Sequence, residues 1–144
     1  MKFTTPSQVN LKPDKLILDK SFVSIYYNAT ENWLYIQWKG DQTEETLLRG
    51  SEQMLECVKS TGSTKLINDS SNFTQTWPNL INWWAENYAP RLQEAGLEYF
   101  AWIYGDKNII KPTADAILQK EKSDILVMVF DNLKTAETWL RSIR

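Results

Sequence analysis

Histidine is absent from this 144-residue chain, and cysteine occurs once. Without histidine there is no Ser-His-Asp or Cys-His nucleophilic system and no histidine-ligated metal site. The lone Cys57 excludes a disulfide within the chain and a cysteine-rich metal centre. Carboxylates, Lys, Tyr or an unassisted hydroxyl are the remaining catalytic groups. The sequence therefore predicts a protein that is not an enzyme and that has no metal site and no cofactor.

A surplus of positive charge and long apolar runs are also missing. The formal net charge is −2 and the isoelectric point is near 5.2, which gives no electrostatic footprint for nucleic acid. No stretch approaches the roughly 20 apolar residues of a membrane-spanning helix, and residues 1–8 lack the apolar core of a signal peptide. We therefore expect a cytoplasmic protein with no nucleic-acid partner and no membrane span.

The composition is that of one folded domain. Apolar residues make up 42% of the chain and charged residues 24%, which is ordinary for a globular protein. Residues 1–15 are polar and contain Pro6 and Pro13, so we expect an irregular N-terminal arm. Residues 16–144 are then the single domain.

Two neighbouring stretches predict a β-hairpin. Residues 22–28 and 33–39 are rich in β-branched and aromatic side chains, which favours strands. The short linker between them suits a hairpin turn. Alternate apolar positions give the hairpin one side that faces a core.

The next segment predicts a helix and a third strand. Asp41 can cap the helix, with Glu44 three residues later, and Gly62 ends it. Gly50 falls on the inner face, where it either permits close approach to the sheet or is incidental. Residues 64–68 then form a short strand.

A further helix begins at Trp77-Pro78 and carries an apolar stripe to Leu92. Pro90 must kink or split this helix, because a proline pushes the preceding residue, here Ala89, away from helical geometry. Residues 97–104, in which only Glu98 is charged, and the unbroken apolar run 125–130 suit inner strands with helices on both sides.

Helices are also predicted for residues 112–122 and 131–144 from their apolar spacing. The order is therefore β-β-α-β-α-β-α-β-α. It predicts an α/β fold, with a single mixed, mostly parallel, five-stranded sheet and flanking helices.

Four stretches carry a resemblance to a known family. They are Trp38-Lys39-Gly40, residues 65–71, residues 84–96 with their internal proline, and residues 130–140 with Ala136 and Trp139-Leu140. In this order they resemble the STAS superfamily, the fold of bacterial anti-sigma-factor antagonists, and in particular SpoIIAA-like bacterial proteins. The resemblance spans most of residues 20–143.

The resemblance implies a regulatory role at the turn after the third strand. In antagonists of that family a partner kinase phosphorylates a serine there, and position-by-position matching points to Ser71. The family motif continues with Gly-Leu-Gly and enters its helix at once, whereas this chain has a longer loop, residues 72–76, without those glycines. Related proteins also lean toward lipid-carrier folds, which implies a bound apolar ligand.

The candidate site is this corner and the aromatic residues that follow it. Ligands bind at the carboxyl ends of strands in open α/β sheets, although an Asx or Ser turn that only satisfies backbone donors explains the same residues. The chain has seven tryptophans, and exposed aromatics mark interfaces or clefts. Adjacent Trp83 and Trp84 lie about 100° apart on a helix, so one of them faces the surface or a cleft edge. The candidate residues are Asp69, Ser70, Ser71, Asn72, Trp77 and Trp83.

Two functions follow from these observations. The first is a non-enzymatic STAS-type interaction module, switched at Asp69-Ser70-Ser71, with an unidentified protein partner and a homodimer expected from the aromatic excess. The second is a small-molecule binder, with an apolar or anionic ligand in a cleft between the helix at residues 77–92 and the sheet. A closed apolar pocket favours the binder, and a shallow surface with exposed tryptophans favours the module. A carboxylate-dependent enzyme, the third class, needs an enclosed polar pocket around Asp69.

Overall fold

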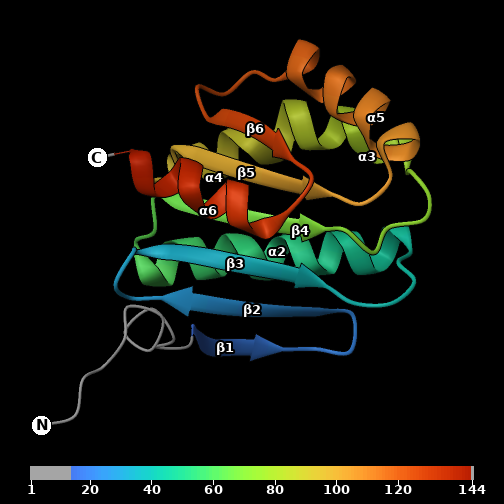
Figure 1. The fold of residues 1–144 in the computed structure, drawn as a ribbon. Helices are drawn as coiled ribbons and strands as arrows, with labels where there is room; N and C mark the ends of the chain where they lie inside the picture. Colours follow the sequence, from blue (N-terminus) through green and yellow to red (C-terminus); the bar gives the residue numbers. More distant parts are fainter. Residues whose placement is uncertain (1–13, 144) are drawn as a thin grey trace, which may run out of the picture.

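The protein is built on one six-stranded sheet whose strands lie side by side in chain order (Figure 1). The computed structural model describes residues 14–143, apart from the side chains of residues 107, 109 and 110. Strands β1 to β3 form an antiparallel meander, and β3 to β6 run parallel to one another. The strands are β1 (Lys15–Asp19), β2 (Val23–Asn28), β3 (Trp33–Trp38), β4 (Lys65–Ser70), β5 (Tyr99–Tyr104) and β6 (Leu126–Phe130).

The prediction of a five-stranded, mostly parallel sheet was wrong. Strand β1 was not predicted, and with it the first half of the sheet is antiparallel. Its register against β2 shifts between Leu16 and Leu18. The remainder of the predicted arm, residues 1–13, lies outside the described residues. Strand β6 is an edge strand rather than an inner one, and its Leu126 is 50% exposed.

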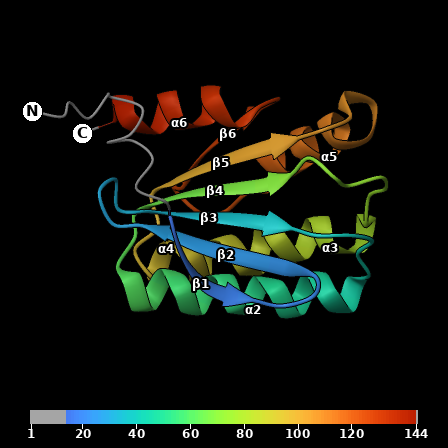
Figure 2. The same cartoon turned by 60° about the horizontal axis from the view of Figure 1, so that its bottom comes forward.

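Helices cover the two faces of the sheet unequally (Figure 2). The connections between parallel strands all pack on one face, because right-handed crossovers between strands whose order never reverses fall on the same side. Of the described helices, α6 alone packs on the other face, over β4, β5 and β6. No helix in the described range is long and apolar enough to cross a membrane. The helices are α2 (Glu44–Thr61), α3 (Pro78–Trp83), the π-helix η1 (Trp84–Tyr88), α4 (Ala89–Glu94), α5 (Lys107–Lys120) and α6 (Leu133–Ser142).

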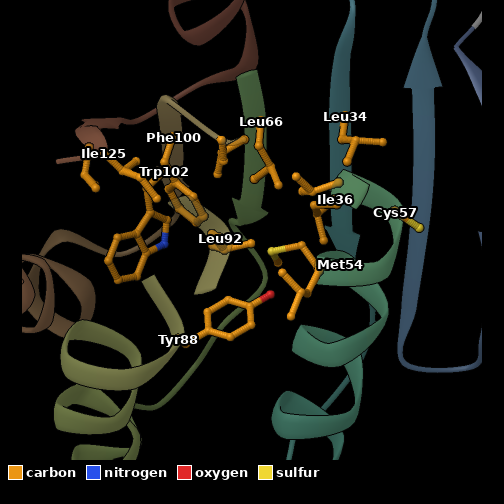
Figure 3. Close-up of a cluster of buried hydrophobic side chains, with 14 of the residues drawn as sticks. Leu34, Ile36, Met54, Cys57, Leu66, Tyr88, Leu92, Phe100, Trp102 and Ile125 are labelled. Atoms are coloured by element: carbon orange, nitrogen blue, oxygen red, sulfur yellow. The ribbon is translucent and has the colours of Figure 1, made fainter. Parts of the chain in front are cut away.

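The larger core lies between the sheet and helices α2, η1, α4 and α5 (Figure 3). Ile36, Leu66 and Phe100 contribute from the strands, and Leu92 contributes from α4; all four are fully buried. The buried Tyr88 donates its hydroxyl to the Ser51 backbone carbonyl, which ties η1 to α2. A smaller core of Trp33, Ile67, Ala101, Ile103, Ala136 and Leu140 lies under α6.

The predicted helix that contains Pro90 is divided into α3, η1 and α4, as predicted, and the break takes the form of a π-turn. The N–H of Ala89 bonds the carbonyl of Trp84, five residues back, instead of Ala85. The freed Ala85 carbonyl accepts from the backbone N–H of Lys122 at 3.3 Å. Ala89 itself keeps helical angles (φ −59°, ψ −41°), so the expectation that it leaves helical geometry was wrong. The extra residue in the turn absorbs the distortion instead.

Helix α2 starts and ends on specific residues. Thr43 caps it by accepting from the Thr46 N–H at 3.1 Å, and the Thr46 hydroxyl accepts from the Thr43 N–H. The cap is therefore Thr43 rather than the predicted Asp41. Gly62 ends the helix in the left-handed conformation with φ 67°, as predicted.

Gly50 is the point where α2 touches the sheet. A Cβ at this position would lie 2.4 Å from a ring carbon of Trp38, far inside van der Waals contact. The close approach to the sheet is therefore confirmed, and the glycine is required by packing.

We expect Gly50→Ala to destabilise the protein by about 1–2 kcal/mol. Overpacking against Trp38 costs about 1–3 kcal/mol, and the gain in helix propensity offsets up to about 1 kcal/mol of it. Urea denaturation measures the change. Glu56→Ala, at an exposed position of the same helix, should change stability by less than about 0.5 kcal/mol. A stabilised Gly50→Ala variant would show that the helix can move away from the ring.

Candidate functional site

An aromatic cleft lies between the carboxyl ends of strands β3 to β5 and the helices α2, α3, η1 and α5. Its volume is about 100 Å³, and it is partly open to solvent. No side chain among the described residues that line it carries a charge. Five of the seven tryptophans line it: Trp38, Trp77, Trp83, Trp84 and Trp102.

The walls are made of rings that contact one another. Trp84 meets Phe100 edge-on at 5.2 Å between ring centroids and stacks with Trp102 at 6.4 Å. From the loop, Phe73 meets Trp77 edge-on at 5.2 Å and lies 6.2 Å from Trp38. Edge-on and offset contacts of this kind stabilise aromatic pairs beyond the area they bury. The loop after β4 is thereby packed back onto the sheet, where it closes one side of the cleft.

Two buried polar residues of β4 form the floor. The Trp38 indole Nε1 donates to Asn68 Oδ1 at 2.8 Å, and Asn68 Nδ2 donates to Ser70 Oγ at 3.1 Å. The Trp102 indole Nε1 also donates to Ser70 Oγ, at 3.3 Å. An indole nitrogen can only donate, so these bonds fix the orientation of the Asn68 amide. Asn68 is 8% exposed and Ser70 is 1% exposed.

The predicted corner is divided between two faces of the sheet. Strand β4 continues to Ser70, and alternation along the strand points Ser70 into the cleft and Asp69 away from it. Asp69 accepts from the Tyr35 hydroxyl and, at 3.0 Å, from the Ser71 N–H. Ser71 and Asn72 are exposed in the turn beyond the strand.

The other two candidate residues line the cleft with Ser70. Trp77 and Trp83 are both half-buried, and Trp83 stacks on Tyr88 at 4.9 Å. Trp84, the neighbour of Trp83, is half-buried in the cleft as well. The structure thus brings Ser70, Trp77 and Trp83 together and leaves Asp69, Ser71 and Asn72 outside the cleft.

Sequence reasoning did not include Asn68, Trp102 or Trp38 among the candidate site residues. A signal for Asn68 was present, because it sits between Leu66 and Ser70 on one face of the strand. A polar residue at such an inward position is normally hydrogen-bonded, which points to a donor nearby. That donor is Trp38, which lies in another strand.

The turn at Asp69 is held by its own contacts. Asp69 Oδ1 and the Ser71 N–H close an Asx turn, which is the alternative explanation stated for these residues. Gly105 lies against it, since a Cβ there would be 2.1 Å from the Ser71 carbonyl oxygen. Asp69 is half-buried and does not line the cleft. In the described part of the chain no cluster of side chains has the ligands for a metal ion.

Comparison of the chain with protein-family models found no match, and comparison with curated proteins found none either. The resemblance to the STAS superfamily therefore stays a prediction that rests on its four stretches of sequence. The structure adds a mixed α/β fold with a six-stranded sheet.

The Tyr35–Asp69 bond predicts a loss of stability at alkaline pH. Burial, and then the bond to Asp69, hold the pKa of the Tyr35 phenol well above its usual range. An unfolded tyrosine loses its proton near pH 10, so the contribution of Tyr35 is full below that pH and declines above it. For one retained proton the loss is about 1.4 kcal/mol at pH 11.

Tyr35→Phe removes this titration. We expect it to lower the free energy of unfolding at pH 8 by about 1–2 kcal/mol, through the lost hydrogen bond to a carboxylate. The difference in the free energy of unfolding between the variant and the unmodified protein should then shrink by about 1.4 kcal/mol by pH 11. Urea denaturation at both pH values gives the two differences. Equal differences would mean that Tyr35 titrates normally in the folded protein.

Proposed function

We propose that the protein is a non-enzymatic, cytoplasmic binding protein for a small uncharged molecule, held in the cleft between the Trp77–Leu92 segment and the sheet. The observation that carries the proposal is the gathering of five tryptophans around one cleft with a hydrogen-bonded polar floor. Ligand sites are typically concave and mostly apolar, with a few placed polar groups. This arrangement matches that description.

The lining favours a neutral ligand over the anionic one that the sequence left open. An anion in a mostly apolar site needs a cation or several N–H donors close by. Among the described residues the cleft has no lysine or arginine. The nearest polar groups in the wall and mouth are uncharged hydroxyls and amides, from Ser51, Gln75 and Thr76.

Blocking the cleft tests the proposal. Leu80→Trp places a large ring in the half-buried rim of the cleft, and Leu118→Trp places the same ring on α5 at a side chain that is 45% exposed and does not line the cleft. A panel of small uncharged molecules is screened by ligand-observed NMR against all three proteins. We expect the unmodified protein and Leu118→Trp to bind the same molecules and Leu80→Trp to lose at least tenfold in affinity, because the introduced ring takes up the ligand's volume.

Two results would contradict the proposal. One is that no molecule binds the unmodified protein. The other is that Leu80→Trp binds every hit as tightly as Leu118→Trp, with both variants folded by circular dichroism.

A second candidate, the STAS-type interaction module, is favoured by the exposure of Ser71. Ser71 lies at the surface, in a turn that is bonded to Asp69 and packed against Gly105, so a partner protein can reach its hydroxyl. Phosphate on Ser71 would add nearly two negative charges beside Asp69. In this reading the partner is a kinase-like protein or a second copy of the chain, and the added charge releases it.

Affinity capture with Ser71→Asp and its isosteric control Ser71→Asn tests the second candidate. The module predicts a partner that is retained by the unmodified protein and by Ser71→Asn but lost with Ser71→Asp, because only the aspartate adds charge. Identical captured proteins from all three would reject a charge switch at this turn.

A further inference from the structure

We propose that the ligand of the cleft is a flat, ring-sized, uncharged molecule with one hydrogen-bond acceptor, and that this acceptor binds the hydroxyl proton of Ser70. The inference rests on the proposed function and narrows it to a chemical class. It comes from the direction of the hydrogen bonds on the floor, the size of the cleft and the charge of its lining.

The hydrogen bonds of the floor all run toward Ser70. Trp38 donates to Asn68, Asn68 donates to Ser70, and Trp102 donates to Ser70. A serine hydroxyl has two lone pairs and one proton, so both acceptor positions of Ser70 Oγ are in use. Within the described chain Ser70 Oγ donates no hydrogen bond to another residue. Ser70 is 1% exposed and lines the cleft, so this proton is offered to whatever the cleft holds.

The floor therefore offers mainly donors: both acceptor positions of Ser70 Oγ are in use, and Asn68 Oδ1 already accepts from Trp38. The second N–H of the Asn68 amide is likewise without an acceptor among the described side chains, and Asn68 also lines the cleft. A ligand that brings a carbonyl, ether or ring-nitrogen acceptor satisfies a buried donor, which is costly to leave unpaired. A ligand that brings only donors leaves the protons of Ser70 and Asn68 without an acceptor.

Size and shape limit the rest of the ligand. A cleft of about 100 Å³ is of the order of the engineered cavity of about 150 Å³ that binds benzene. It is too small for a lipid chain. Aromatic walls favour a flat ring, which stacks on them or meets them edge-on.

The partial positive charge of the hydrogens on the floor also disfavours an organic cation as the ligand. Aromatic cages bind quaternary ammonium groups through the faces of their rings. Here the polar end of the cleft presents the hydrogens of Ser70 and Asn68, which repel a cation, and no carboxylate of the described residues lines it.

Two matched probes test the inference. Acetophenone and α-methylstyrene have the same shape, but a carbonyl oxygen in the first replaces a methylene group in the second. Affinities are measured from the fluorescence of the cleft tryptophans, for the full-length protein and for Ser70→Ala, Ser70→Thr and Ser71→Ala. We expect Ser70→Ala to weaken acetophenone about five- to tenfold and to change α-methylstyrene less than about twofold. Ser70→Thr, which keeps the hydroxyl, should keep the preference for acetophenone over α-methylstyrene. Ser71→Ala, outside the cleft, should bind both probes as the unmodified protein does.

The outcomes separate the inference from the function on which it rests. If Ser70→Ala weakens both probes equally, or neither, the hydroxyl does not select the ligand, and the inference fails while ligand binding stands. Tighter binding of benzyltrimethylammonium or benzoate than of acetophenone would also overturn it, in favour of a charged ligand. If none of the four probes binds the unmodified protein, the proposed function itself fails.

Discussion

Two indole N–H groups, of Trp38 and Trp102, are buried against the sheet and need acceptors, and β4 supplies both. A buried donor without a partner costs about 1–3 kcal/mol, so Asn68 and Ser70 allow two of the largest side chains to be packed at this place. The same bonds use both acceptor positions of Ser70 Oγ and one of the two of Asn68 Oδ1. The groups that remain available to a ligand are therefore set by the hydrogen bonds that the two tryptophans need.

The strand order decides where such a site forms. In a doubly wound sheet the strand order reverses, and ligands bind in the crevice at that point. Here the order never reverses, so the connecting helices share one face and no such crevice exists. The space arises instead between the layers, where the segment split at Pro90 lies over the ends of β4 and β5. The π-turn fits Trp84 against Phe100 and Trp102.

Local rules predicted the local features. The hairpin of β2 and β3, the end of α2 at Gly62, the contact at Gly50 and the break at Pro90 each depend on a few neighbouring residues, and each is confirmed. Strand β1 was not predicted, because Leu16-Ile17-Leu18 is a short apolar run next to a polar segment. The position where β4 ends was not predicted either, and one residue decides the face on which Ser70 lies. The cleft needed the pairing of strands far apart in the sequence, which no local pattern contains.

The strict sequential order of the sheet has a consequence for how the chain acquires its structure. Each strand pairs only with its neighbours along the chain, so each pairing needs just the one connection between two successive strands to close. During synthesis the antiparallel meander leaves the ribosome first, and every later strand finds an open edge already waiting for it. The sheet can therefore grow from one side while the chain is still being made.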